Sequence, residues 1–225
     1  WTAFGARARV LAYDPALLGP DVEAPRTWES LADPFWAPRM ALANPLFGTT
    51  RGHVAAMFAL WGPQRARDFL QFLADHGAAV VDGNGAAVRA VAGGDRCACM
   101  TDTDDVIVAR KQHPRIEMCF PDMGDGGTVV IPNTVALIEG GGRGDPTRGD
   151  PTRGDRARRL YDFLASADVE RMLARSDSRN IPVREALRKE LGMEMPPETK
   201  LTFDQITDAM DEATAMGVTQ ALRGL

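Results

Sequence analysis

The segment TDTDD (residues 101–105) places three aspartates within four positions, directly after the apolar run RCACM (96–100). Clustered carboxylates bind hard cations, and they would also satisfy the cationic amine group of a ligand. Carboxylates are equally favoured in the first turn of a helix, where the macrodipole is positive. Both interpretations stay open for Asp102, Asp104 and Asp105, although three carboxylates are more than a helix cap needs.

Two more loops follow an apolar run and precede a predicted helix: NPLFGTT (44–50) and DGNG (82–85). Helix N-termini offer free N–H groups and a positive dipole end, so both loops suit an anion. The hydroxyls of Thr49 and Thr50 and the amide of Asn84 add neutral donors. Helix capping by the same side chains is the simpler alternative for each loop taken singly.

Two arginines, Arg7 and Arg9, flank Ala8 at the first predicted strand, so their side chains point to one side of it. Either guanidinium could clamp an oxyanion through two hydrogen bonds, and a solvent-facing pair is the alternative. His53 comes one turn into the helix that follows the FGTT sequence, and we expect a satisfied surface residue there.

Short apolar runs alternate with helical periodicities along most of the chain. Strands are predicted at residues 8–13, 39–43, 78–81, 96–100 and 115–120, with an extended stretch over 127–138. Amphipathic helices are predicted between the strands and again from Arg156, and a capping box at 202–205 opens the last helix. This alternation predicts an α/β fold whose ligands lie at the carboxyl ends of the strands.

No catalytic set emerges, because the sequence has no serine nucleophile elbow, no Walker loop and no histidine pair at metal spacing. The rival interpretation is a phosphotransferase like the haloacid dehalogenases, with Asp102 as nucleophile and Asp104 two residues later. Val106 stands where those enzymes have a threonine. A binding protein that is not an enzyme is therefore favoured.

The chain of 225 residues has 44% hydrophobic residues and a formal net charge of −5. This composition suits one or two domains with real cores, and the mildly acidic balance argues against a nucleic-acid binder. No apolar run is long enough to span a bilayer, and no export signal is visible. Because the chain begins at Trp1 without a methionine, its start is interpreted as a cut.

Three cysteines and one repeat have plain structural interpretations. Cys97, Cys99 and Cys119 are expected to be buried strand residues, with a soft-metal site as the alternative. The tandem GDPTR repeat at 144–153 predicts a solvated loop. Its RGD tripeptides follow from the repeat, which makes an integrin-type ligand the lesser interpretation.

Several motifs occur in an order that is more specific than any one of them. They are GARARVL (5–11), TWESLADP (27–34), ANPLFGTT (43–50), GN (83–84), TDTDD (101–105), IPNTVALI (131–138), RRLYDFLASADVE (158–170) and IPVRE (181–185). Over residues 4–185 this order resembles the iron(III)-type extracellular solute-binding proteins of ABC importers.

The resemblance implies a class II periplasmic-binding fold, in which two α/β lobes are joined by crossing strands, with the first lobe incomplete in this chain. The implied segments are a crossing strand (1–12), the second lobe (13–120), a return into the first lobe (121–185) and a C-terminal helical segment (186–225). Ligand would bind in the cleft between the lobes and close them about a hinge.

The resemblance also implies a function, partners and a location. The chain would be a monomer that captures a small anionic or zwitterionic ligand, or ferric ion with a synergistic anion, and delivers it to the permease subunits of an ABC importer. No cofactor is implied beyond the transported metal ion or phosphate-like anion. The location would be periplasmic or otherwise extracytoplasmic, with lipid anchoring as an option.

The resemblance carries over to individual residues. In the relatives an arginine on the first crossing strand helps to bind the anion, and Arg7 matches it; the loop 47–50 and Asn84 match further parts of that site, with Gly85 in place of the usual serine. The candidate ligand-binding residues are Arg7, Asn44, Gly48, Thr49, Thr50, Asn84, Thr101, Asp102, Asp104 and Asp105. We expect the arginine, the two threonines and Asn84 to converge on one anion-sized pocket.

The iron site of the relatives is altered in this sequence. Those proteins bind iron through two adjacent tyrosines in the loop where this chain has TDTDD (101–105). The only tyrosines here, Tyr13 and Tyr161, fall in a predicted strand and a predicted helix. We therefore expect the aspartates, and not a phenolate, to bind the cationic part of the ligand.

Overall fold

The computed structural model describes residues 1–138 and 153–213, and all of the GDPTR repeat except its last residue lies outside them. The chain divides into two compact units. Unit 1 comprises Trp1–Arg7 and Ile131–Met195, and unit 2 comprises Ala8–Val130 with the chain from Pro196 onward. The boundaries between these units lie after residues 7, 130 and 195, whereas the predicted segments end at residues 12, 120 and 185. The assignment of those segments to two lobes stays a prediction.

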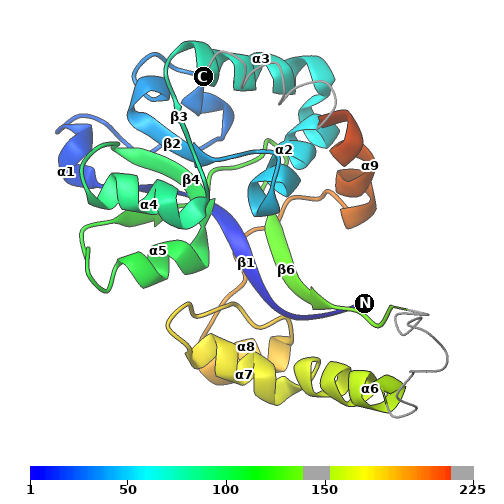
Figure 1. Ribbon diagram of the computed structural model, residues 1–225. Helices are drawn as coiled ribbons and strands as arrows, with labels where there is room; N and C mark the ends of the chain where they lie inside the picture. Colours follow the sequence, from blue (N-terminus) through cyan, green and yellow to red (C-terminus); the bar gives the residue numbers. More distant parts are fainter. Residues whose placement is uncertain (139–152, 214–225) are drawn as a thin grey trace. The chain divides into compact units, whose positions relative to one another are not determined.

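Unit 2 is built on a mixed sheet whose strands lie in the order β3-β2-β4-β1-β5 (Figure 1). Its strands are β1 (Thr2–Tyr13), β2 (Met40–Ala43), β3 (Ala79–Val81), β4 (Ala98–Asp102) and β5 (Glu117–Cys119). Strands β2, β3 and β4 are parallel, whereas β1 runs antiparallel to β4 and β5. Strand β6 (Val130–Val135) pairs with β1 beside this path. The predicted α/β class is confirmed, and each predicted strand has a counterpart at a similar place in the chain.

One strand lies two residues later than predicted. The run 96–100 was expected to form it, but β4 covers Ala98–Asp102 and is buried along its whole length. Thr101 and Asp102 consequently belong to the strand and not to the following turn. This displacement decides which side chains of the acidic segment lie in the core of the sheet.

Helices cover both faces of the unit 2 sheet. The described helices of unit 2 are α2 (Gly48–Trp61), α3 (Pro63–Asp75), α4 (Asn84–Ala92), α5 (Thr103–Ala109) and α9 (Phe203–Ala213), with the short helices α1 (Pro15–Leu18), η1 (Glu29–Leu31) and η2 (Ala37–Arg39). Val10 of β1 packs in a buried cluster with Val88 of α4 and Val106 of α5. The next residue towards the N-terminus, Arg9, contacts His53 of α2, so α2 covers the opposite face, as the alternation of a strand requires.

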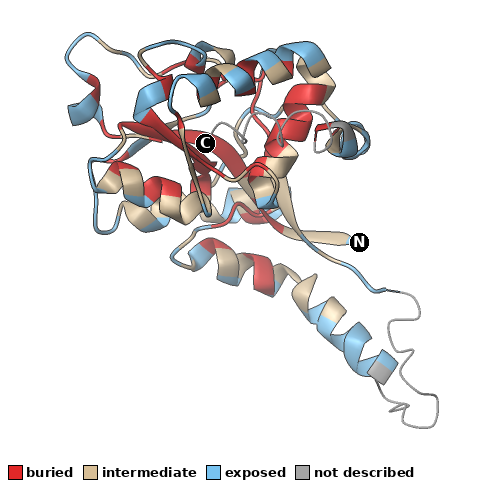
Figure 2. Ribbon diagram, turned by 45° about the horizontal axis from the view of Figure 1, so that its top comes forward, coloured by how far each residue is buried: buried red, intermediate tan, exposed pale blue. Residues whose placement is uncertain are grey.

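The buried residues of unit 2 are concentrated on these central strands and on α2 (Figure 2). Local sequence explains where the helices begin. Pro63 opens α3 directly after Gly62, whose φ of +83° ends α2. At α9 the Thr202 N–H donates to the Gln205 side chain and the Gln205 N–H donates to the Thr202 hydroxyl, which confirms the predicted capping box.

Unit 1 contains the helices α6 (Arg153–Leu164), α7 (Ala167–Arg175) and α8 (Glu185–Leu191). Ser166 caps α7 by accepting a hydrogen bond from the Val169 N–H. The buried carboxylate of Glu170 is paired with Arg184. Among the described residues of the whole chain, no helix is long and apolar enough to cross a membrane.

Candidate ligand site at the carboxyl edge of the unit 2 sheet

The three predicted ligand loops lie at one edge of the sheet. Because β2, β3 and β4 are parallel neighbours, their carboxyl ends face the same way. Helix α2 begins at Gly48, α4 begins at Asn84 and α5 begins at Thr103, each directly after one of these strands. The edge thus gathers three helix N-termini, as the sequence predicted.

The centre of the site is a buried ion pair between adjacent strands. In the antiparallel register of β1 and β4, Arg9 lies opposite Asp102. The Arg9 Nη1 donates to Asp102 Oδ1 at 2.7 Å, and both side chains are completely buried. A buried charge needs such a partner because the interior solvates it poorly.

Two side chains from the helix N-termini complete the bonding of the Asp102 carboxylate. The Thr49 hydroxyl donates to Asp102 Oδ2 at 2.6 Å, and the Asn84 amide donates to the same oxygen at 2.9 Å. Asn84 also donates to the Thr49 oxygen at 2.9 Å and accepts from the Thr50 hydroxyl at 3.3 Å. Residues from β1, β4, α2 and α4 therefore form one polar network around the buried ion pair, with Thr49 and Asn84 partly exposed.

His53 extends this network into the core, which overturns the expectation of a surface residue. It is completely buried and its ring meets Trp28 edge-on, with ring centroids 4.4 Å apart. The Arg9 Nε donates to His53 Nδ1 at 3.2 Å. Since arginine is always protonated, Nδ1 acts as the acceptor and a neutral ring carries its hydrogen on Nε2. Burial, and then the Arg9 charge, hold the pKa of His53 well below its usual range.

Two polar atoms of this buried network have no hydrogen-bond partner. They are Arg9 Nη2 and His53 Nε2. A buried donor without an acceptor is costly, so these two atoms are the least satisfied part of the network.

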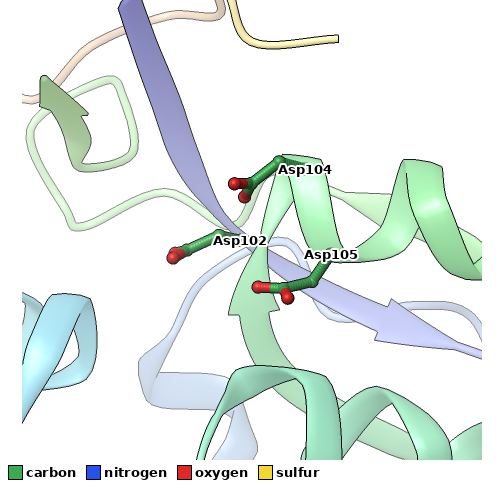
Figure 3. A group of neighbouring side chains, drawn as sticks. All are labelled: Asp102, Asp104 and Asp105. Carbon is green, nitrogen blue, oxygen red and sulfur yellow. The ribbon is translucent and has the colours of Figure 1, made fainter. Parts of the chain in front are cut away.

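The other two aspartates lie in the first turn of α5. Asp102, Asp104 and Asp105 each offer one carboxylate oxygen, and these oxygens lie within 4.8 Å of one another. In Figure 3 all three side chains extend to the same side of the end of β4. Asp105 also accepts a hydrogen bond from the Thr101 hydroxyl at 3.5 Å. The predicted cluster is therefore compact, although one member already serves Arg9.

Helix capping does not explain Asp102. It occupies the N-cap position of α5, but its side chain makes no capping hydrogen bond. Its carboxylate points instead to donors from β1, α2 and α4, as described above. The simpler alternative from the sequence thus fails for this aspartate.

The arginine that bonds to the aspartate cluster is Arg9, whereas the sequence analysis expected Arg7 to lie at the ligand site. Arg7 belongs to unit 1, where its guanidinium donates to the side-chain oxygen of Asn133. The structure therefore does not join Arg7 with the two threonines and Asn84 in one unit. The reason is register: strand alternation gives both arginines the same side, but only Arg9 lies opposite Asp102.

The remaining candidates have local backbone roles. The Asn44 side chain accepts from the Leu46 N–H at 3.0 Å, which shapes the turn after β2. Gly48 has a φ of +57°, a left-handed conformation that favours glycine. Thr101 is buried in β4 opposite Val10.

Neither tyrosine belongs to the acidic segment at this edge of unit 2. Tyr13 pairs with Ala98 at the start of β4, whereas the acidic residues follow the end of that strand. Its hydroxyl donates to Glu117, and burial together with that carboxylate raises the pKa of Tyr13 to about 12. Tyr161 belongs to unit 1, with its hydroxyl bonded to Thr2. No phenolate of unit 2 is placed to help the aspartates.

The cysteines fit the structural interpretation. Cys97 and Cys99 are buried and Cys119 is partly buried, and all three are free thiols. Burial raises the pKa of Cys119 to about 11 and raises that of Cys99 further. Among the described residues, the only group of potential metal-ligating side chains is the aspartate cluster.

Solved structures share this fold. A ferric binding protein from Campylobacter jejuni has a TM-score of 0.77 at 15% identity, and the match covers 97% of this chain and 69% of that one. Apo FutA2 from Synechocystis PCC6803 has a TM-score of 0.69 at 21% identity, covering 97% and 70%. Iron-bound HitA from Pseudomonas aeruginosa has a TM-score of 0.66 at 21% identity, covering 99% and 67%. The predicted periplasmic-binding-protein fold is therefore confirmed.

Sequence comparison identifies the family. No curated protein matches the chain. A model of the family described as "Bacterial extracellular solute-binding protein" matches residues 1–205, which is most of the chain. Its members bind solutes and are not enzymes, which decides against the phosphotransferase alternative. Membership implies a periplasmic or other extracytoplasmic location. This chain belongs to the bacterial extracellular solute-binding protein family.

Proposed function

We propose that this chain is the solute-binding component of an ABC importer and that it captures a hard cation, or the cationic group of a small molecule, at the aspartate cluster. The observation that carries the proposal is the convergence of three carboxylate oxygens within 4.8 Å at the carboxyl edge of the sheet. Open α/β sheets place their ligands at this edge. The family supplies the role of solute capture.

Charge favours a cation over an anion as the solute. Arg9 compensates Asp102, so the pair is neutral as a unit. Asp104 and Asp105 add two more carboxylates beside it. Carboxylate oxygens this close together suit a cation, because one ion can contact several of them at once. Carboxylate oxygen is the ligand that hard cations prefer.

Ferric iron is one cation in this class. The similar solved structures from Campylobacter and Pseudomonas are a ferric binding protein and an iron-bound protein by name. In this chain Tyr13 pairs with the start of β4, away from the acidic residues at its end, and Tyr161 belongs to unit 1. We propose that any ferric ion is held by carboxylate oxygens, in which case the complex lacks the purple colour of iron bound to phenolate.

The proposal is tested by isothermal titration calorimetry of the full chain with ferric ion, calcium, magnesium and a simple alkylamine. Asp104→Asn combined with Asp105→Asn should weaken binding of the preferred cation at least tenfold, because two charged ligands are lost. The matched control is Asp82→Asn, which neutralises an exposed aspartate following β3 at the same edge. Equal affinity in the paired variant and the control would refute capture by the cluster.

A further inference from the structure

The donors that gather at the carboxyl edge of unit 2 are those of an anion site. They comprise the guanidinium of Arg9, the hydroxyl of Thr49 and the amide of Asn84. Thr49 and Asn84 come from the first turns of α2 and α4, where the helix dipoles are positive. A carboxylate or phosphate from solution would be well satisfied by this set.

That set is already occupied by the chain itself. One oxygen of Asp102 accepts from Arg9 at 2.7 Å, and the other accepts from Thr49 at 2.6 Å and from Asn84 at 2.9 Å. The carboxylate is completely buried and makes no bond to the helix it precedes. Its contacts are those expected of a bound carboxylate ion, held by charged and neutral donors.

We propose that Asp102 is a built-in anion. In the native chain the donors of Arg9, Thr49 and Asn84 then bind no free anion. They accept a small carboxylate such as formate only when the Asp102 carboxylate is removed. A second free anion at Arg9 would meet the buried charge of Asp102 and would be repelled. The ion pair is neutral, so the site needs no further negative charge for its compensation.

Two buried donors without a partner indicate that the surroundings of Asp102 suit a negative charge. Arg9 Nη2 and His53 Nε2 are buried without an acceptor, although Arg9 is bonded through its other nitrogens. Both atoms are buried, so a solute in water does not contact them while Asp102 is in place. An environment with surplus buried donors stabilises a negative charge strongly.

A built-in anion also affects how the solute is bound, and this step rests on the proposed function. Capture of a cation at Asp104 and Asp105 would then proceed without an accompanying anion at Arg9, because the chain provides the anion. The built-in anion itself rests only on the contacts of Asp102, so the two claims can fail separately.

The test is chemical rescue of Asp102→Ala. This change leaves the buried Arg9 charge uncompensated and opens a space of about the size of a formate ion. We expect formate, up to about 100 mM, to stabilise the variant in a saturable way and to leave the native chain unchanged. A tenfold excess over the dissociation constant should raise the unfolding midpoint by roughly 3–6 °C in a chain of this size. Sodium chloride at equal concentration controls for ionic strength.

Tryptophan fluorescence is a suitable signal, because Trp28, Trp36 and Trp61 all belong to unit 2. The matched control is Asp14→Ala. Asp14 is also buried, but its partner Arg115 is 75% exposed, so water can compensate that arginine. Formate should stabilise Asp102→Ala and not Asp14→Ala.

A second control combines Asp102→Ala with Arg9→Gln, which removes the charge that would hold formate, and rescue should disappear. If Asp102→Ala is too unstable to purify, the yield of its refolding with formate and with chloride gives the same comparison. Absence of a formate effect in both measurements would overturn the proposal.

The native chain provides a test that needs no fragile variant. Titration with formate and with phosphate should give no binding that depends on Thr49. Binding that is measurable in the native chain and weakened in Thr49→Val would overturn the proposal. Rescue by formate together with no cation binding would support the built-in anion and refute the proposed function. Cation binding without rescue by formate would support the proposed function and refute the built-in anion.

Discussion

The Arg9–Asp102 pair should stabilise unit 2 far more than an exposed ion pair does. Arg9→Met would leave the buried Asp102 carboxylate with only the neutral donors Thr49 and Asn84. Removing one partner of a buried pair costs about 3–5 kcal/mol. Because two hydrogen bonds remain, we expect the lower end, about 3 kcal/mol in the free energy of unfolding. Asp102→Leu should cost a similar amount, since it leaves Arg9 uncompensated.

The double variant measures how strongly the two residues are coupled. Arg9→Met with Asp102→Leu removes both charges at once, and an apolar replacement of a whole buried pair is often tolerated. We expect the double variant to lose at least about 2 kcal/mol less than the sum of the two single losses. Urea unfolding followed by tryptophan fluorescence gives these values, because the signal comes mainly from unit 2.

An exposed pair serves as the control for this cycle. Arg65 Nε lies 2.5 Å from Glu29 Oε1, and the two side chains are 63% and 35% exposed. Arg65→Met should cost less than about 1 kcal/mol, because water already screens the pair. Additive losses for Arg9→Met and Asp102→Leu, within about 0.5 kcal/mol, would show that the pair is not the energetic centre of the network.

Two further predictions concern the core around the site. The pKa of His53 is lowered in the folded chain, so below about pH 6.5 the unfolded chain takes up a proton that the folded chain refuses, and stability should fall by about 1.4 kcal/mol per pH unit. Urea unfolding measures how much unfolding free energy is lost between pH 7.5 and pH 5.5. This loss should be smaller in His53→Gln than in the native chain, and it should be unchanged in the exposed control His113→Gln. An equal loss in all three proteins would contradict a neutral buried histidine. A Cβ at Gly127 would clash with the backbone of Glu198, so Gly127→Ala should destabilise the chain by about 1–3 kcal/mol. Gly52→Ala, in open space within α2, should instead stabilise by about 0.5–1 kcal/mol, and equal effects of the two substitutions on thermal unfolding would refute the close approach.

The edge of the sheet that carries the site was predictable from sequence. Three apolar runs each precede a loop and a helix, and parallel strands place such loops together. The donors Thr49 and Asn84 and the acidic segment were identified on that basis. Their chemistry depends on residue type and local position, which the sequence states directly.

The choice of Arg9 over Arg7 was not predictable in the same way. Both arginines lie on one side of the strand, so local periodicity does not separate them. The separation comes from the register that sets Arg9 opposite Asp102, and β1 and β4 are some ninety residues apart in sequence. Register between distant strands is fixed by the whole sheet and not by either strand alone.

The burial of His53 was missed for a related reason. A single histidine in a helix carries little information about its environment. A usable signal was nevertheless present, because His53 follows Thr49 by four residues and so shares its face of α2. A helix face that carries a ligand-loop threonine points towards the sheet, and a histidine on it should be expected inside.

Binding of the cation by the aspartate cluster can be observed directly. Its most direct test is a crystal structure of the chain with the cation preferred in calorimetry, located by anomalous scattering. We expect one ion with oxygens of Asp104 and Asp105 at about 2.0–2.6 Å, and with Arg9 still bonded to Asp102. An ion bound through Tyr13 or elsewhere, with no contact to Asp104 or Asp105, would contradict it.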